Sequence, residues 1–571
     1  MTQDAAEPKE KESETNIKET IESILIAFIL AFIFRAFIVE AFVIPTGSMA
    51  PTLMGAHMRF RCEDCGYEWT VNFPTNSEGD DVTIPSRAYL LTRDGRIVVD
   101  DSKRPVSRTY HLNCPNCGYQ VPRFNDANPD NSATSPPVHY GDRILVLKYL
   151  YLFQQPKRWD VVVFKSPEQP YKYDYQQNYI KRLIGRPGET IMLLDGDVYV
   201  APNVADKDPT ADDFAVQTKP RNVQDALWRV VYDNDYYPQN KASDRSNGKA
   251  RAWKQPWTAQ AGQRGWTLNG RDFTFDNTTG AADIFFDASA NPDKHSLTDW
   301  LAYDITVDQS ATRRDSYDDP TYTPDDNVSD VRLSFFYQRT GGDGAITASL
   351  SKLDRTFIAE ITPGKATLFQ RFPNAAPQVL ASVSLDVDTT KPTRIDLINC
   401  DYQVTMRVND KQVLQTTPQQ YHPDVHYLLS AFARHDKLDK PSIHIAAANQ
   451  KCTISHLSLW RDVYYMNRVP NFSGGRLTWA VPDQFPDNLM RLKADPPEYF
   501  CCGDNSPISG DGRYWQTDIN LPDEDLVVES GRVPGRFLLG KAFFVYWPAG
   551  FRPVEQAPAL VPNFGDMRFI H

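Results

Sequence analysis

The sequence predicts a mainly β protein that a single N-terminal transmembrane helix anchors to a membrane. Three observations lead to this fold class: an apolar run over residues 21–39, short alternating runs between turn residues in much of the remaining chain, and 42 prolines. A chain of 571 residues is too long for one compact core, so we expect two to four domains. The formal net charge of −12 argues against a nucleic-acid partner, which would require a basic face.

The membrane segment follows a polar, mixed-charge stretch, residues 1–20, which we expect to be a disordered tail. Residues 21–39 are apolar except for Glu22, Ser23 and Arg35, and as a helix they would span about 28 Å, the hydrocarbon thickness of a bilayer. A buried core helix could be equally apolar. A cleavable signal peptide would need a basic start and a cleavage site with small residues, which this region lacks. We therefore expect a retained single-pass anchor.

A candidate nucleophile stands directly after this segment. Gly47 gives the backbone freedom beside Ser48, and Pro45 and Pro51 stiffen the chain on both sides. Nucleophilic catalysis needs a serine on such a rigid turn, although a Gly-Ser pair beside prolines is usually only a loop.

A candidate general base lies in the β-type run 179–184. Lys181 would normally be solvated on such a strand, but an inward face would bury its amine and lower its pKa. Each pKa unit costs about 1.4 kcal/mol, which the fold must supply. A neutral amine could then accept the proton of a serine hydroxyl.

A loop rich in Gly, Asp, Asn and Ser occupies residues 499–515 and predicts a tight, hydrogen-bonded turn. Within it, Asp511 and Arg513 are placed to form an ion pair. An alternating strand after a turn, residues 140–148, is the remaining piece of the pattern.

These pieces, in this order behind a membrane anchor, resemble bacterial type I signal peptidases, the Ser–Lys enzymes that remove signal peptides from secreted proteins. The resemblance covers residues 20–57, about 138–200 and about 495–548, and it ends on a run that looks like the family's final strand, residues 540–548. It implies a discontinuous antiparallel β peptidase domain over residues 40–60, 138–202 and 495–550, with no cofactor for catalysis.

The resemblance also implies residue roles. Ser48 would be the nucleophile and Lys181 the general base, with the Ser48 N–H and the Thr46 hydroxyl forming the oxyanion hole. The residues that would orient or support the lysine are Ser509, Asp504, Asp511 and Arg513. A serine–histidine mechanism is the alternative, with His57 and His139 beside the motifs. Relatives of that type place histidine where this chain has Lys181, so the lysine mechanism is favoured.

Two departures from the family pattern stand out. The loop segment 506–508, Ser-Pro-Ile, is less polar than usual, and about eighty residues separate the serine motif from the following Gly-Asp turn, where the family has a few.

The location follows from geometry together with the resemblance. Only residues 40–47 separate the apolar run from Ser48, and fully extended they reach at most about 28 Å, so the serine would work close to the bilayer surface. This implies a cytoplasmic tail, a span of the cytoplasmic (inner) membrane and an extracytoplasmic catalytic domain. The implied partners are secreted preproteins and membrane lipid.

A first insertion, residues 61–137, carries two CxxC pairs, Cys62 with Cys65 and Cys114 with Cys117. Each pair with its following Gly-Tyr resembles a zinc knuckle, and four thiolates would hold a structural zinc with no open position. Two local disulfides are the alternative. The other four cysteines, Cys400, Cys452, Cys501 and Cys502, lack this spacing.

A second insertion comprises an unassigned connector, 203–262, a β-sandwich, 263–465, and a return segment, 466–494, while 551–571 forms a C-terminal tail. Parts of the sandwich resemble laminin-G or concanavalin-like jelly rolls, with a carbohydrate or protein as a possible ligand. We expect the ends of the insertion, near Pro202 and Asp495, to lie together and the insertion to be a separable module. A second hypothesis is an anchored binding protein with a relic peptidase core. The presence of Thr46, Ser48, Lys181 and Ser509 favours the enzyme.

Overall fold

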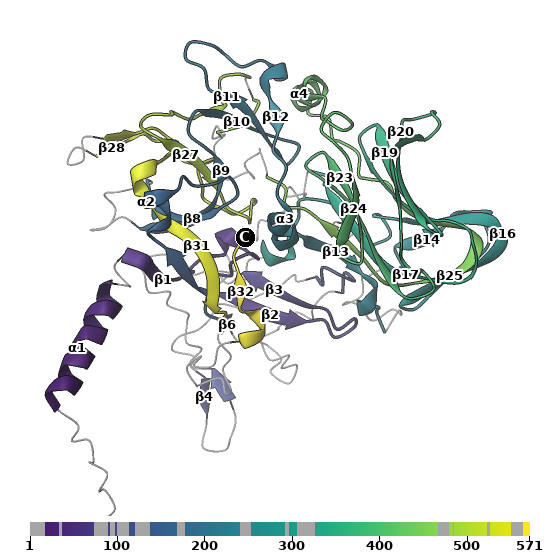
Figure 1. Ribbon diagram of the computed structural model, residues 1–571, viewed down its shortest axis with the longest axis horizontal. Coiled ribbons are helices and arrows are strands. Elements are labelled where there is room, and N and C mark those ends of the chain that lie inside the picture. The colour runs from purple at the N-terminus through teal and green to yellow at the C-terminus, as the bar shows by residue number, and fades with distance from the viewer. Residues whose placement is uncertain are drawn as a thin grey trace, which may run out of the picture.

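The computed structural model of the chain is built mainly from antiparallel strands (Figure 1). It describes residues 17–33, 37–72, 89–91, 97–99, 113–119, 138–167, 177–239, 253–291, 296–304, 326–465, 479–483, 485–521, 526–549 and 563–571. The predicted N-terminal tail up to residue 16, most of the first insertion and nearly half of the return segment therefore lie outside the described residues.

Helix α1 (Ile17–Ile33) projects from the body of the molecule at its N-terminal end (Figure 1). Its apolar side chains are exposed, with Phe28 and Leu30 each 60% accessible. None of the helices within the described ranges combines the length and apolarity needed to cross a bilayer. The helix predicted over residues 21–39 differs at both ends. It begins at Ile17, within the predicted disordered tail, and strand β1 (Val39–Val43) already begins at Val39 and pairs with β7 (Arg143–Leu147).

The first sheet brings together the three predicted peptidase segments. Its order is β1-β7-β31-β8-β9-β27-β30, and β32 pairs with β31. The further strands are β8 (Val161–Lys165), β9 (Asn178–Gly185), β27 (Glu498–Cys502), β30 (Val533–Pro534), β31 (Leu538–Trp547) and β32 (Arg568–Phe569). Strand β32 belongs to the predicted C-terminal tail, which instead extends this sheet in the middle of Figure 1.

A second, four-stranded sheet marks the junction with the second insertion. Its order is β12-β11-β10-β26, formed by β12 (Ala215–Val216), β11 (Asp197–Pro202), β10 (Glu189–Leu194) and β26 (Met490–Arg491). The Asn203 side-chain amide donates to the Leu492 carbonyl at 2.9 Å. The two ends of the insertion therefore lie side by side, as predicted.

The first insertion contributes β3 (Glu68–Asn72) to a small sheet whose other strands, β2 (His57–Arg61) and β6 (Val138–His139), stand at its two ends. The insertion also contains a separate pair of strands, β4 (Tyr89–Leu91) and β5 (Ile97–Val99). A further hairpin, β28 (Ile519–Leu521) with β29 (Leu526–Val528), precedes β30.

The second insertion is dominated by a 13-stranded sheet with the central order β21-β20-β19-β18-β25-β17-β22-β23-β24, while β13, β14, β15 and β16 extend it on the other side of β25. The strands are β13 (Arg229–Asp233), β14 (Trp257–Ala259), β15 (Trp266–Asn269), β16 (Asp272–Phe286), β17 (Val331–Gly342), β18 (Ile346–Lys352), β19 (Arg355–Thr362), β20 (Lys365–Arg371), β21 (Gln378–Ser384), β22 (Thr393–Cys400), β23 (Gln403–Val408), β24 (Lys411–Gln415) and β25 (Ile443–Arg461).

Burial alternates along these strands, as in β18, so one face lines a core. Strands β20 and β21 contact β24, so the sheet curls until its two ends meet. The strand-rich character of this insertion is as predicted, and its assignment as a jelly roll stays a prediction. The connector 203–262, which the sequence left unassigned, contributes strands to both sheets. Its strands β13 and β14 pair within the large sheet, and β12 pairs with the peptidase strand β11.

The helical segments are short. In the part of the chain that the structure describes, the α-helices besides α1 are α2 (Leu150–Phe153), α3 (Arg221–Leu227) and α4 (Val425–Ala433), and the 3₁₀ turns are η2 (Gly47–Met49), η4 (Ala211–Asp213), η5 (Asn234–Tyr236), η7 (Ala302–Asp304), η9 (Gly535–Phe537) and η10 (Phe564–Asp566).

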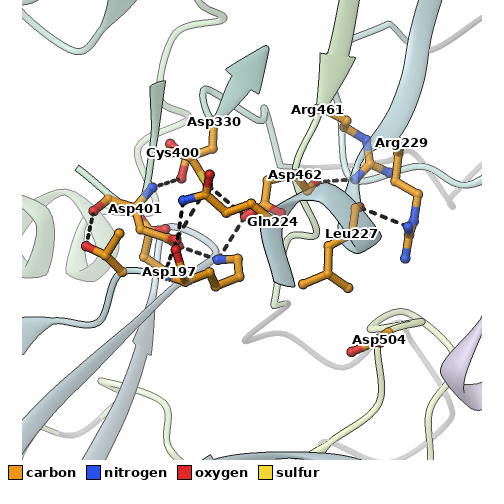
Figure 2. A network of polar contacts seen from close by, with 12 residues as sticks. Asp197, Gln224, Leu227, Arg229, Asp330, Cys400, Asp401, Arg461, Asp462 and Asp504 are labelled. Carbon is orange, nitrogen blue, oxygen red and sulfur yellow. Dashed lines mark hydrogen bonds and ion pairs between the residues drawn. The ribbon is translucent and has the colours of Figure 1, made fainter. Parts of the chain in front are cut away.

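Buried charges join the second insertion to the peptidase strands. The Lys352 ammonium, at the end of β18, contacts Asp197 of β11 at 2.9 Å and Asp330 at 2.6 Å, and all three side chains are buried. Beside them, Lys219 pairs with Asp401 and Asp462. Figure 2 shows these two carboxylates in one cluster with Asp330 and Cys400. Breaking a buried pair leaves an uncompensated charge. The second insertion therefore packs against the peptidase strands, and its behaviour as a separable module stays a prediction.

Candidate active site

The serine turn is held from both sides by a single residue, Asp142, through its carboxylate and its backbone carbonyl. Gly47–Met49 form the turn η2, and Asp142, just before β7, accepts a hydrogen bond from Met54 N at 3.0 Å through its side chain. The Asp142 carbonyl also accepts from Ile44 N at 2.9 Å, so residues before and after Ser48 are fastened to the same turn. Gly141 is required there, because a Cβ would lie 1.8 Å from the Ile44 carbonyl oxygen. The Gly-Asp turn was visible in the sequence, but its hydrogen bonds to the residues around Ser48 were not.

Lys181 lies beside Ser48, as the resemblance implies. It sits on β9 opposite Val162 of β8, and its Nζ is 2.8 Å from Ser48 Oγ. The residue is 5% exposed. Burial lowers the pKa of Lys181, and the Asp511 carboxylate opposes that shift without cancelling it. An amine in this position is poised to accept the serine proton.

The Asp511–Arg513 pair predicted from the loop is present. Arg513 donates from Nε to Asp511 Oδ1 at 2.9 Å and from Nη2 to Asp511 Oδ2 at 2.8 Å. Asp511 Oδ2 also accepts from Gly503 N at 2.9 Å, and Arg513 Nη1 donates to Ser506 Oγ at 2.7 Å. Burial raises the pKa of Asp511, but Arg513 and these hydrogen bonds outweigh it and hold the pKa below its usual value. The loop therefore keeps an ionised carboxylate near the lysine.

Asp504 supports the lysine strand from a different direction. Its carboxylate accepts two hydrogen bonds of 2.7 Å from Arg182 Nε and Nη2, and both residues are fully buried. Arg182 also donates to the Trp159 carbonyl at 2.7 Å. Because neighbouring strand residues face opposite sides, Arg182 holds β9 from behind while Lys181 faces Ser48. The sequence analysis missed Arg182, whose only signal was a second cation in an apolar strand.

Ser509 is buried next to the serine turn. A Cβ on Gly503 would lie 2.2 Å from Ser509 Oγ and 2.3 Å from the Ser48 carbonyl oxygen, so both serines approach the same glycine. Within the described ranges Ser509 Oγ makes no hydrogen bond, and its role in orienting Lys181 stays a prediction. Thr46 is exposed, and its side chain makes no capping bond to η2.

Asn505 is a further site residue that the sequence analysis did not single out. Its backbone N–H donates to the Ser48 carbonyl at 3.1 Å, and its side-chain amide donates to the Gly47 carbonyl at 3.1 Å. The loop that carries Asp504 and Asp511 thus also fastens the serine turn. The only signal in the sequence was an asparagine in a tight loop.

The histidine alternative is not supported by the geometry. His57 hydrogen-bonds through Nδ1 with the Gly55 carbonyl at 2.7 Å and stacks on His139, with ring centroids 5.6 Å apart. Burial lowers the pKa of His57 to about 4. The side chain placed against Ser48 Oγ is that of Lys181.

The four CxxC cysteines form one buried cluster. Cys62 Sγ lies 3.7 Å from Cys117 Sγ, Cys65 Sγ lies 3.6 Å from Cys114 Sγ, and all four sulfurs are within 4.8 Å of one another. A tetrahedral zinc with Zn–S bonds of about 2.3 Å requires S–S edges of about 3.8 Å, so the donor set fits that ion. All four cysteines are free, which contradicts the disulfide alternative.

The two CxxC pairs make the same backbone hydrogen bond. Cys62 N donates to the Tyr67 carbonyl and Cys114 N to the Tyr119 carbonyl, each at 2.8 Å. Gly66 and Gly118 take φ values of 78° and 74°, in the left-handed region that favours glycine. The Cys-Gly-Tyr sequence of each pair thus forms the same tight turn around the sulfurs.

A comparison with known protein families matches the segments that carry Ser48 and Lys181. The family described as signal peptidase, peptidase S26, matches residues 17–68 and 124–251, which include Ser48 and Lys181. The probable signal peptidase I-2 of Synechocystis sp. is 30% identical over 104 residues, which cover 18% of this chain and 48% of that protein. Signal peptidase I V of Bacillus subtilis is 35% identical over 77 residues, which cover 14% of this chain and 42% of that protein.

The chain therefore spans less than half the length of either relative. Among solved structures, a carbohydrate-binding module, CBM66, from Bacillus subtilis covers 36% of this chain and 94% of its own, at 13% identity and a TM-score of 0.22, a likeness too weak to support an argument. The family match coincides with the segments that bring Lys181 to Ser48, so over these segments the chain is similar to the signal peptidase family, peptidase S26.

Proposed function

We propose that this chain is a membrane-anchored serine endopeptidase that removes signal peptides from secreted preproteins with Ser48 as nucleophile and Lys181 as general base. The observation that carries the proposal is the 2.8 Å separation of Lys181 Nζ and Ser48 Oγ at a lysine whose pKa burial lowers. A neutral amine at hydrogen-bond distance is what proton abstraction from a serine requires.

The reaction would proceed through an acyl-enzyme. Ser48 Oγ attacks the scissile carbonyl carbon while its proton passes to Lys181 Nζ. The Ser48 N–H and the Thr46 hydroxyl would donate to the oxygen that becomes negative. As the peptide C–N bond breaks, the Lys181 ammonium returns the proton to the leaving amine. Lys181 then takes a proton from water, whose oxygen attacks the ester carbonyl carbon. As the ester C–O bond breaks, the signal peptide leaves with a free carboxylate and the Lys181 ammonium returns the proton to Ser48 Oγ.

The supporting residues would keep this geometry in place. Asn505 and Asp142 hold the serine turn, whereas Arg182, paired with Asp504, holds the lysine strand. Preorganisation of this kind lowers the barrier, because misplaced reacting groups lose much of the rate.

Location at the cytoplasmic membrane is part of the proposal. Helix α1 exposes its apolar side chains and leads within a few residues into β1 and the serine turn. Exposed apolar surface of this extent is stabilised by an apolar environment. The peptidase would then meet preproteins at the outer surface of the bilayer.

We also propose that Cys62, Cys65, Cys114 and Cys117 bind one structural zinc. Four thiolates leave no coordination position open, so the ion would stabilise the fold and would take no part in catalysis. Its place is the first insertion, whose strand β3 ends beside the serine turn.

The test is cleavage of a preprotein by the full chain purified in detergent micelles. Mass spectrometry should find a new mature N-terminus and a separated signal peptide, and the Ser48→Ala variant should produce neither. Equal products from both proteins would attribute the cleavage to a contaminant, and no cleavage by either would reject the proposed function.

A further inference from the structure

A short segment of the second insertion reaches the serine turn. Arg461, at the end of β25, donates to the carbonyls of Asp299 and Trp300 at 3.0 and 2.8 Å, which ties this segment to the large sheet. The segment continues into η7, where the Tyr303 ring lies against Gly47, the residue before the nucleophile. A Cβ on Gly47 would lie only 2.6 Å from Tyr303 Cε1. The second insertion therefore forms a wall of the active site.

The same segment brings a carboxylate to Asn505. Asp304 Oδ1 accepts a hydrogen bond of 2.6 Å from Asn505 Nδ2, and the two residues are 1% and 0% exposed. The other bond from Nδ2 goes to the Gly47 carbonyl at 3.1 Å. A side-chain amide has two N–H donors on this nitrogen, so both now have acceptors.

These two acceptors determine which way the amide faces. A rotated amide would present its oxygen to a carbonyl and a carboxylate, neither of which can donate while Asp304 is ionised. Without Asp304, only the bond to Gly47 would favour the observed orientation. Burial raises the pKa of Asp304 to about 7, whereas the Asn505 hydrogen bond and two neighbouring arginines, Arg461 and Arg229, lower it.

We propose that Asp304 is a positioning residue for the peptidase reaction, which it serves by fixing the Asn505 amide and through it the turn that presents Ser48 to Lys181. The inference rests on the proposed peptidase function. It gives the second insertion a direct part in the active site, through the hydrogen bond between Asp304 and Asn505, which are 201 positions apart in the sequence.

The experiment measures kcat and KM of the full chain in detergent micelles on a short fluorogenic peptide that contains a signal-peptide cleavage site. Asp304→Leu removes the acceptor at similar volume, and Asp304→Asn retains an oxygen that can accept from Asn505. Asp299→Leu is the matched control, because Asp299 is also buried in this segment but is not bonded to Asn505.

For Asp304→Leu, kcat per folded molecule should fall on the order of 10- to 100-fold with KM nearly unchanged, since a small displacement of the nucleophile has effects of this size. Asp304→Asn and Asp299→Leu should retain most of the wild-type kcat. If Asp304→Leu does not fold, Asp304→Ser, which is too short to reach the amide, replaces it.

Three outcomes would overturn the inference: a wild-type kcat in the variant without the acceptor, a loss that appears only in KM, or an equal loss in Asp299→Leu. In all of these the wild type cleaves the peptide and Ser48→Ala does not. If instead the wild type is no more active than Ser48→Ala, the proposed function itself fails.

Discussion

Lys181 Nζ and Ser48 Oγ lie 2.8 Å apart although 133 positions of sequence separate the two residues. The antiparallel pairing of β8 with β9 places the lysine, and the Asp142 and Asn505 bonds place the serine turn. This relationship connects the β architecture to the proposed chemistry, because the reaction requires the lysine as a neutral amine.

The first prediction concerns pH. Since burial lowers the pKa of Lys181 from 10.5, the reactive free base is populated at lower pH than for an ordinary lysine. The value of kcat/KM should therefore rise with pH and level off with an inflection below 10.5. A pH series with the short peptide measures this. An inflection at or above the ordinary lysine value would mean that Lys181 does not act as the buried base.

The second prediction concerns the oxyanion. Thr46→Val preserves the shape of the side chain and removes its hydroxyl, so kcat should fall on the order of 100-fold while KM changes little. Steady-state kinetics of the two proteins provide the measurement, with Thr52→Val, a buried threonine in the same loop, as a control. A change in KM alone would mean that the Thr46 hydroxyl contributes to substrate binding and does not stabilise the transition state.

The third prediction is one tightly bound zinc per chain. Elemental analysis of the purified protein should find it, and Cys114→Ser should lose it, because a thiolate ligand is removed. Cys452→Ser changes a buried cysteine outside the cluster and should retain the metal. A metal-free protein that unfolds at the same temperature with and without added zinc would exclude a structural zinc.

The fourth prediction tests the packing of Tyr303 and Asn72, one from each insertion, against Gly47, the residue before the nucleophile. Gly47→Ala would place a Cβ 2.6 Å from the Tyr303 ring and 3.0 Å from Asn72 Oδ1, so the turn should shift and kcat should fall by about tenfold or more. A second change, Tyr303→Ala, makes room for the methyl group and should restore part of the loss. Failure of the double variant to exceed Gly47→Ala, with both proteins folded, would show that Tyr303 is not the obstacle.

Sequence reasoning recovered the parts of the site that lie in local patterns. Ser48 follows a Gly between prolines, Lys181 interrupts an apolar strand, and Asp511 and Arg513 are two positions apart, so each was visible in a short stretch. The CxxC pairs were visible for the same reason, and their sulfurs do converge.

The residues that were missed act across long separations. Arg182 meets Asp504 at a distance of 322 positions, and Asp304 meets Asn505 at 201. Nothing in a local pattern indicates such pairing, since it depends on how an insertion returns to the sheet. The same limit explains why β32 and β13 were not predicted as strands. Each becomes a strand through its pairing with a distant partner, β31 for β32 and β25 for β13.

The central claim is that Lys181 is the general base for Ser48, and the rate of signal-peptide cleavage by Lys181→Met tests it most directly. Methionine fills the buried volume without an amine, so the variant should fold, as circular dichroism and its unfolding temperature would verify. We predict that its kcat falls by at least about 1,000-fold, to the level of Ser48→Ala, and that Ser509→Ala retains partial activity. Turnover near that of the wild type in folded Lys181→Met would contradict the account.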